Sequence, residues 1–360
     1  MISEIKILVI ASKVRNPISG RLKVLLNWTK GFKSKLIIIK PTFNLEDLKV
    51  VSSGVNIEIV NQHDAKLAIE NFGPSFVFID DRDFDILNLL KDYKIISYIY
   101  PIHGLWAMPG LTTSHLIGLT EKTKVKIYRT IPHFKLRNKY QKFKKYSSTI
   151  IAQSYTSSGI LRYYYGLNPS MVLYNPVDRS IFKPMDSIEK KISSNEITMF
   201  LGSNNGDTDL NLVKKVSRIS KNYGLTLNTF GYEKNLQYAL ENNRETIYFK
   251  KISDSNLANI LSRSHAVILP QVDEPASYVG IESISCGTPV ISCYVDESIV
   301  PSISGYISTS ELFEKFLNSI LSKGIEKTLY EKTIGHSALF DNELEARKLI
   351  SFLKFLPEDD

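Results

Sequence analysis

The chain of 360 residues has very little cysteine and no long hydrophobic run. Its two cysteines, Cys286 and Cys293, exclude a disulfide scaffold and are typical of a protein that folds in a reducing compartment. No apolar run approaches the roughly 18 residues that a membrane-spanning helix needs. The opening segment MISEIKILVIAS lacks the basic start and the small-residue cleavage site of a secretory signal. We therefore expect a cytoplasmic protein whose first segment is a buried strand.

Motifs of several common enzyme classes are also missing. There is no Gly-x-Ser-x-Gly, no Walker sequence and no convincing Gly-x-Gly-x-x-Gly, which argues against a hydrolase, a P-loop enzyme and a dinucleotide-binding enzyme. The six histidines have no metal-ligand spacing. Two Asp-x-Asp strings, at 81–83 and 207–209, have the form of a cation-binding carboxylate pair, but strings this short arise readily by chance. We expect neither a metal site nor a cofactor.

Positive charge is concentrated in the first half of the chain. Residues 1–183 contain 27 Lys and Arg against 13 Asp and Glu, a net charge of +14, whereas residues 184–360 have a net charge of −6. The chain is 43% hydrophobic, which is enough to form the cores of two domains of ordinary size. The asymmetry predicts two halves with different partners.

Buried strands alternate with helices along the first half, which predicts a parallel sheet covered by helices. The expected strands are 5–10, 36–39, 56–60, 76–79, 95–100 and 149–152, and the expected helices are 21–32, 64–72 and 84–91. Ligands bind such sheets beyond the carboxyl ends of the strands. Three segments meet that condition here, namely Ile18–Arg21, Asp80–Asp83 and His103–Gly104.

A proline-containing segment, Asn175–Pro184, has the composition of a domain hinge, and the net charge changes sign there. Beyond it the alternation starts again, with strands at 197–201, 225–230, 247–249 and 266–269 and helices at 210–223 and 256–262. We expect residues 1–178 to form one domain, completed by a last helix in 339–360, and residues 179–338 to form a second.

The stretch Glu274–Ile291 has the composition of a ligand site. Ser277 is a good N-cap for a short helix, which would leave the amides of Tyr278, Val279 and Gly280 free at its N-terminus. Free amides and the helix dipole together favour a phosphate group. Glu282, just over a turn further along, could accept hydrogen bonds from sugar or ribose hydroxyls. The combination suggests a site for a nucleotide sugar.

Taken together, these segments resemble the retaining glycosyltransferases of family 4, which have two Rossmann-like domains facing an interdomain cleft, the GT-B architecture. The resemblance rests on the hinge YNPVDRSIFKP, on the block EPASYVGIESISCGTPVI with its Glu-x7-Glu pattern, and on the segment from IIAQS to YYYGL. It covers most of the second half and the hinge, and the first half more weakly. It implies a metal-independent, hexosyltransferase-type enzyme that moves a sugar from a nucleoside-diphosphate sugar to a hydroxyl acceptor.

The resemblance also implies roles for individual residues. Glu282 would hold the ribose hydroxyls of the donor, Glu274 would contact the transferred sugar, and the amides at Tyr278 and Val279 would hold the diphosphate. In the first domain, His103 would face the reacting centre. Gly20 lies in a loop where the family brings backbone near the diphosphate.

One departure from the family pattern concerns the diphosphate. The family places an Arg and a Lys after the first strand of the second domain, but here Gly202 is followed by Ser203 and Asn204, with no basic residue before Lys214. Because electrostatic stabilisation is usually the largest catalytic term, Arg21, Lys250, Lys251 or helix dipoles would have to substitute. The alternative is a protein that binds a nucleotide sugar without transferring it.

A strongly basic segment, 122–145, contains ten basic residues and no acidic one, interleaved with Tyr128, Phe134, Tyr140 and Phe143. It is either a solvated helix face or a surface for anionic lipid headgroups at the inner face of the cell membrane. No nucleic-acid-binding motif accompanies the charge, so we expect no nucleic acid. With the resemblance, the basic first domain suggests a glycan or lipid-linked acceptor.

Overall fold

The computed structural model describes residues 5–11, 20–29, 32–39, 56–99, 137–185, 187–188, 191, 194–202, 208–271, 277–292 and 327–356, without the side chains of residues 20, 21, 23 and 327–329. These residues form two compact units. The first takes in the described residues before Val177 and those from Asn342 onward, and the second those of Val177–Asp341.

The first unit contains a seven-stranded parallel sheet with the strand order β3-β2-β1-β4-β5-β6-β7. Its strands are β1 (Lys6–Ala11), β2 (Lys33–Ile39), β3 (Asn56–Val60), β4 (Phe76–Asp80), β5 (Ile95–Ile99), β6 (Thr149–Ala152) and β7 (Met171–Val172). The central strands β4, β5 and β6 are buried along their whole length, as expected for a parallel sheet covered on both faces. The chain reverses its direction across the sheet between β1 and β4, which makes their carboxyl ends the switch point.

The helices of the first unit are α1 (Gly20–Trp28), α3 (Ala65–Phe72), α5 (Tyr155–Tyr165) and α13 (Asn342–Phe355), together with a helical segment at residues 137–146. α5 begins at Ser154, whose hydroxyl accepts from the Ser157 amide, and ends at Gly166, which has a left-handed φ of 63°. Both ends follow from local chemistry, because Ser is a favoured N-cap and Gly tolerates a positive φ.

α13 packs against α1 in the first unit. The carboxylate of Glu345, which is fully buried, accepts from the Tyr174 amide at 2.9 Å and pairs with Lys348. The indole of Trp28 in α1 donates to the Tyr174 carbonyl at 3.1 Å. The extended segment at Tyr174 is therefore held by both helices through its backbone.

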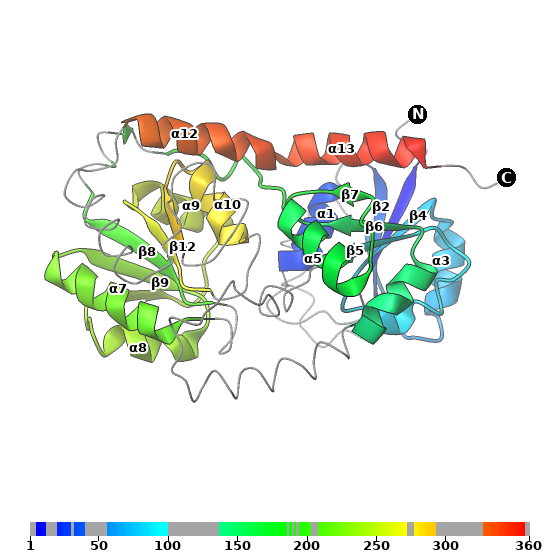
Figure 1. Cartoon of the computed structure of the whole chain (residues 1–360), viewed down its shortest axis with the longest axis horizontal. Helices are drawn as coiled ribbons and strands as arrows, with labels where there is room; N and C mark the ends of the chain where they lie inside the picture. Colours follow the sequence, from blue (N-terminus) through cyan, green and yellow to red (C-terminus); the bar gives the residue numbers. More distant parts are fainter. Residues whose placement is uncertain are drawn as a thin grey trace. The chain divides into compact units, whose positions relative to one another are not determined.

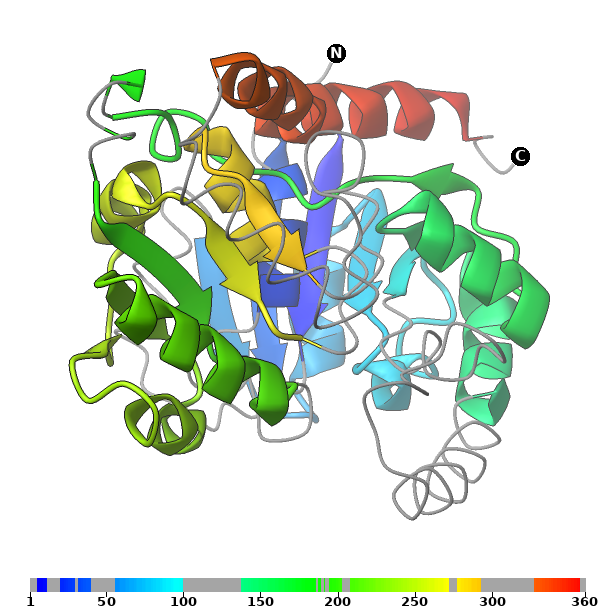
Figure 2. The same ribbon diagram turned by 60° about the vertical axis from the view of Figure 1, so that its left-hand side comes forward.

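The second unit contains a five-stranded parallel sheet with the order β10-β9-β8-β11-β12. The strands are β8 (Glu196–Phe200), β9 (Thr226–Phe230), β10 (Ile247–Phe249), β11 (Val267–Leu269) and β12 (Val290–Ser292). The arrows of β8, β11 and β12, coloured green, yellow and gold, run in the same direction in Figure 2. Here the switch point lies between β8 and β11, since β9 and β10 continue on one side and β12 on the other.

Helices cover both faces of this second sheet. They are α7 (Leu210–Asn222), α8 (Leu236–Leu240), α9 (Asp254–Arg263), α10 (Tyr278–Ser285) and α12 (Lys327–Ser337). Figure 1 shows α7 and α8 on one side of the sheet and α9 and α10 on the other. The apolar stripe of α7, including Val213 and Val216, packs on Ile197 and Met199 of β8. Full burial of such a side chain contributes roughly 1.5–3 kcal/mol.

The α/β fold class predicted from the sequence is confirmed by these two parallel sheets. Two helix predictions were wrong in detail. Residues 84–91 form a 3-10 turn, η2 (Phe84–Ile86), followed by further turns, and not a helix. The backbone hydrogen bonds here run from the amide of residue i+3 to the carbonyl of residue i, as from Leu87 to Phe84 and from Leu90 to Leu87. Ile86, Leu87 and Leu90 are buried, and the connection is short for an α-helix. The last helix is interrupted at Asp341, between η6 (Ala338–Phe340) and α13.

Candidate functional site

Open parallel sheets bind ligands where the chain direction reverses, which in the second unit is at the carboxyl edge, beyond β8 and β11. Gly202 follows β8 at this edge and has a left-handed φ of 82°. Its carbonyl accepts from the Tyr232 amide, which follows β9, at 2.9 Å. Gly231 allows this approach, because a Cβ there would lie 2.7 Å from the Gly202 carbonyl oxygen.

The short helix α10 begins beside this edge. The Ser277 hydroxyl accepts from the Gly280 amide at 3.3 Å, so Ser277 is the N-cap that the sequence predicted. The prediction that the Gly280 amide is free was wrong, because the cap itself uses that amide. Tyr278 and Val279 are the first two helical residues, and amides at these positions have no acceptor within a helix. The amides and the helix dipole make this end of α10 suitable for an anion.

Glu282 lies one turn into α10 and is only 4% exposed. A carboxylate buried to that degree needs hydrogen-bond donors or positive charge around it. At this position it is well suited to accept hydrogen bonds from hydroxyl groups. α10 therefore combines a terminus suited to an anion with a buried carboxylate.

The C-terminal turn of α10 is held by a buried lysine that the sequence analysis did not single out. Lys191 is 1% exposed, and its Nζ donates to the carbonyl of Cys286 at 3.3 Å and to the hydroxyl of Thr288. A cation at a helix C-terminus is stabilised by the negative end of the dipole. Thr288 in turn donates to the Leu261 carbonyl of α9. The network ties the end of α10 to α9.

The N-terminus of α7, which also faces the carboxyl edge, differs from that of α10. Its N-cap is Asp209, whose carboxylate accepts from the amides of Asn211 at 2.9 Å and Leu212 at 3.1 Å. Burial raises the pKa of Asp209, although these two hydrogen bonds oppose the shift. The protein thus supplies its own anion to this helix terminus.

The two lysines expected near the donor, Lys250 and Lys251, lie on the surface of the second unit, as does Lys214, the first basic residue after Gly202. Lys250 follows β10 and pairs with Glu233 at 3.1 Å, with 71% of its side chain exposed. Lys251 is exposed beside it. Lys214, in α7, pairs with Glu241 at 3.2 Å. Two of the three cations thus have a carboxylate partner.

Several predicted site residues are outside what the structure describes. His103 and Glu274 lie outside the described residues, and so do Ser203 and Asn204, which stand where the family has basic residues. Gly20 is the first residue of α1 and not part of the preceding loop, and Arg21 follows it without a described side chain. Of the predicted donor-binding residues, the structure brings together Ser277, Tyr278, Val279 and Glu282 on α10.

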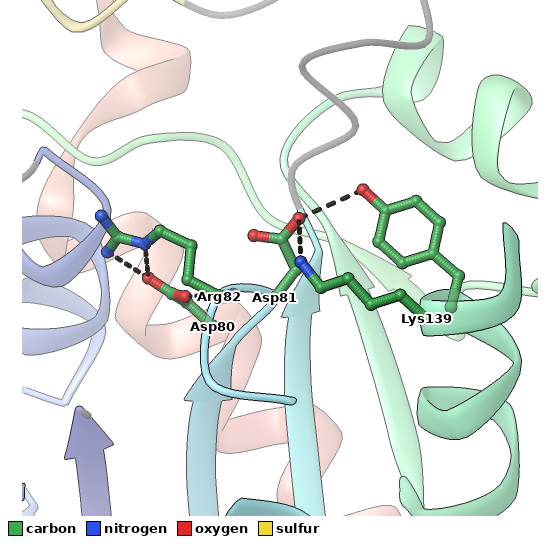
Figure 3. Close-up of polar contacts among 5 residues, drawn as sticks. Asp80, Asp81, Arg82 and Lys139 are labelled. Carbon is green, nitrogen blue, oxygen red and sulfur yellow. Dashed lines mark hydrogen bonds and ion pairs between the residues drawn. The ribbon is translucent and has the colours of Figure 1, made fainter. Parts of the chain in front are cut away.

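The carboxyl end of β4 in the first unit carries a buried acidic cluster (Figure 3). Asp80 accepts from the backbone amide of Arg82 at 2.6 Å and from its Nε at 2.8 Å. Asp81 accepts from the Tyr140 hydroxyl at 3.1 Å, and Lys139 Nζ lies 3.9 Å away. Figure 3 shows Asp80 against Arg82 and Asp81 against Lys139, so the two carboxylates have separate partners. Among the described residues, no group of three or more His, Cys, Asp or Glu side chains could hold a metal ion.

Two buried amides, missed in the sequence, flank the carboxyl end of β8. Asn235 is in η5 (Glu233–Asn235), after β9, and its Nδ2 donates to the Leu201 carbonyl at 2.8 Å. Gln271 follows β11, and its Nε2 donates to the Phe200 carbonyl at 3.3 Å. The only sequence signal for Gln271 was its place just after a strand, and Asn235 had none.

Comparison with known proteins supports the predicted fold, and it matches one family model to part of the chain. Residues 189–327 match the family model described as glycosyl transferases group 1. No curated protein sequence matches the chain.

Solved structures match over nearly the whole chain. HepE from Anabaena, in complex with UDP-glucose, is 14% identical with a TM-score of 0.70, over 98% of this chain and 100% of that chain. Sucrose-phosphate synthase from Thermosynechococcus elongatus is 14% identical with a TM-score of 0.71, over 98% and 99%. The apo form of the lipopolysaccharide outer core galactosyltransferase WaaB is 15% identical with a TM-score of 0.61, over 98% and 100%. At these identities the likeness shows the fold alone, which is the expected GT-B fold.

Proposed function

We propose that the chain, whose residues 189–327 match the family model of the group 1 glycosyl transferases, is a retaining, hexosyltransferase-type enzyme. It moves a sugar from a nucleoside-diphosphate sugar to a hydroxyl group of a glycan or lipid-linked acceptor. The second unit binds the donor, and the first unit recognises the acceptor.

The observation that carries this proposal is that α10 has both an N-terminus suited to an anion and a buried carboxylate. This helix lies inside the matched segment. Its N-terminus is suited to the diphosphate, and the buried carboxylate of Glu282 is suited to ribose hydroxyls. The network of Lys191 and Thr288 holds the opposite end of the same helix. Both donor contacts thus sit on one rigid element, which favours accurate positioning. His103 and Glu274 complete the site by resemblance, with His103 at the reacting centre and Glu274 against the transferred sugar, and no metal takes part.

A second candidate, a nucleotide-sugar-binding protein without transfer activity, is favoured by one specific observation. The carboxylate of Asp209 caps α7, whose terminus would otherwise be available to an anion. Negative charge there works against the leaving diphosphate, and Lys214 and Lys250 pair with carboxylates of their own. If the protein does transfer a sugar, the positive charge that stabilises the leaving diphosphate comes from the α10 dipole and from Arg21 or Lys251.

Donor turnover separates the two candidates. The assay offers UDP-glucose first, and then other UDP-, GDP- and ADP-sugars, with glycan and lipid-linked hydroxyl acceptors, and measures release of the nucleoside diphosphate. The proposal expects acceptor-dependent release from at least one donor. Tight binding of a donor without release from any pair would favour the second candidate, and no binding at all would reject both.

A Glu282→Gln variant tests the donor site. Loss of a charge-assisted hydrogen bond of about 1.5–3 kcal/mol predicts donor affinity lowered roughly 10- to 100-fold. The matched control is Glu345→Gln, which neutralises an equally buried carboxylate on α13 of the first unit. Calorimetric titration of both variants gives the comparison. Unchanged donor affinity in Glu282→Gln would remove Glu282 from the site.

We also propose that the basic segment 122–145 docks on an anionic membrane surface at the inner face of the cell membrane, where a lipid-linked acceptor would be found. In its described part, Arg137, Lys142, Lys144 and Lys145 are exposed. The aromatic part of the sequence argument was wrong for Tyr140 and Phe143, which are 2% and 0% exposed and anchor the helical segment to the core. Charge, rather than these rings, would drive the attachment.

An exposed aromatic does lie on the neighbouring helix. The side-chain amide of Gln141 donates to the Tyr165 carbonyl at the end of α5 at 2.9 Å, so the basic segment and the last turn of α5 are adjacent. That turn carries Arg162 and also Tyr163, which is 84% exposed. A basic surface with an accessible tyrosine suits the headgroup region. No helix in the described ranges is both long and apolar enough to cross a bilayer.

Co-sedimentation with vesicles tests the attachment. Binding to phosphatidylglycerol vesicles, but not to phosphatidylcholine vesicles, is expected at low salt and should weaken as salt rises. At about 1 kcal/mol per basic residue, Lys144→Glu with Lys145→Glu should lower binding at least tenfold. Lys66→Glu with Arg347→Glu makes the same change in net charge at two other exposed positions. If both double variants lost the same amount of vesicle binding, net charge alone would explain the effect, and the basic segment would be rejected as the membrane surface.

A further inference from the structure

The side chains of Asn235 and Gln271 form a matched pair at the carboxyl end of β8. They are 0% and 3% exposed. The NH2 group of Asn235 donates to the carbonyl of Leu201, which follows β8, and that of Gln271 donates to the carbonyl of Phe200, the last residue of β8. A carbonyl oxygen can only accept, so this contact fixes which end of each amide faces β8. Both amide oxygens therefore face away from the strand.

Neither amide oxygen has a hydrogen-bond partner in the part of the chain that the structure describes. Buried polar atoms are nearly always satisfied, and each exception needs an explanation. Four such side-chain atoms occur among the described residues, and the other two are Thr149 Oγ1 in the first unit and His265 Nδ1 at the amino end of β11. The two amide oxygens alone flank the edge where a ligand is expected.

The backbone around this pair is firmly held. Gln271 forms an antiparallel bridge with Thr208, and the amide of Asp209 donates to the Pro270 carbonyl at 2.7 Å. The amide of Asn235 donates to the Tyr232 carbonyl at 3.0 Å. Groups fixed in this way need little reorganisation when a ligand arrives.

We propose that Asn235 Oδ1 and Gln271 Oε1 are acceptors for O–H or N–H groups of the donor and determine which nucleotide sugar binds. The inference rests on the proposed function and adds specificity residues to its donor site. Ionised phosphate oxygens only accept hydrogen bonds, so two amide oxygens do not suit the diphosphate. Sugar hydroxyls, ribose hydroxyls and the N–H groups of a base are the donors that fit. A site with buried acceptors rejects analogues that lack the matching group.

The test is a coupling measurement between side chain and ligand. UDP-glucose, or the nucleotide sugar that binds best in the panel above, is titrated into the parent protein, Gln271→Met and Asn235→Leu. The same titrations use analogues that each lack one sugar or ribose hydroxyl or a base N–H. We expect the parent to bind at least one of these analogues about three- to tenfold more weakly than the full donor. The variant that lacks the matching amide oxygen should bind that analogue and the full donor with equal affinity.

Matched controls exclude a merely structural effect. Asn243→Leu removes another buried amide of the same unit, one whose groups bond to Ser220 and to the Glu245 amide. It should keep the discrimination of the parent. Thermal unfolding of each variant identifies any that fails to fold. Gln271→Asn or Asn235→Gln, which keeps an amide but shifts its oxygen by one bond, then replaces that variant and should lose the discrimination as well.

The outcomes are distinct. Coupling seen with UDP itself assigns the contact to the nucleoside, and coupling seen only with UDP-glucose assigns it to the sugar; either supports the proposal. If both variants lose affinity for every analogue by the same factor, or lose none, the proposal is overturned while the donor site on α10 stands. If the parent binds no nucleotide sugar, the proposed function itself fails.

Discussion

Replacement of Gly287 by alanine should destabilise the second unit through two separable effects. Gly287 follows α10 with a φ of 70°, a conformation that costs an L-residue about 1–2 kcal/mol. An added Cβ would also lie 2.4 Å from Cε2 and 3.0 Å from Cδ2 of Tyr330 on α12. No Cβ approaches a ring this closely, so the ring or the turn must shift, at about 1–3 kcal/mol for an overpacked site. The expected total is about 2–5 kcal/mol.

The chain offers a control for the backbone effect alone. Gly224, in the turn after α7 of the same unit, has a φ of 66°, and its added Cβ would meet nothing within 4 Å. Gly224→Ala should therefore cost only about 1–2 kcal/mol. The difference between the two variants isolates the contact with Tyr330.

Denaturant unfolding measures both variants, with the transition of the second unit followed separately because a chain with two units need not unfold in one step. Donor affinity is the second measurement, since a shifted turn displaces the end of α10 and loosens its bonds to Lys191. If Gly287→Ala and Gly224→Ala were equally destabilised to within about 0.5 kcal/mol, Tyr330 would not press on this turn, and the account of how α10 is anchored would be wrong.

Three further outcomes are expected. Lys191→Met leaves the Cys286 carbonyl without its buried donor, so unfolding by urea should show a loss of about 1–3 kcal/mol; a variant as stable as the parent would contradict the network. Burial, and then the charge of Lys191, lower the pKa of His265 from 6.5. The folded protein therefore binds fewer protons than the unfolded chain just below pH 6.5, and stability should fall as the pH drops through that window, less so in His265→Gln. Burial raises the pKa of Cys286 to about 12, so its thiol should resist alkylation at pH 8 until denaturant is added, as mass spectrometry of the labelled peptides would show.

Local signals in the sequence were sufficient for the elements that local chemistry controls. Ser277 at the start of α10 and Gly166 at the end of α5 occur where the capping rules put them, because those bonds join neighbours along the chain. The β-branched runs of β2 and β4 marked buried parallel strands for the same reason. The sequence also predicted the α/β class and the residues of α10 that lie together.

Side-chain partners far apart in the chain were decided only by the tertiary structure. Tyr140 and Phe143 were equally consistent with a membrane surface until the Asp81 contact placed one ring and the core enclosed the other. Asp209, by contrast, looked like half of an Asp-x-Asp string, but its carboxylate caps α7 through the amides of Asn211 and Leu212. Those bonds join neighbours along the chain, so the sequence already contained this signal.

The carboxyl edge of the second sheet shows the same division. The sequence by itself determined that a helix capped by Ser277 and carrying Glu282 one turn further along would follow β11, because N-caps and helical spacing act over a few residues. Only the folded sheet brings Asn235 and Gln271 to the two sides of β8 and aims their amide oxygens away from it. Their separation along the chain carries no periodicity, and strand order, which sets their proximity, is a property of the whole sheet.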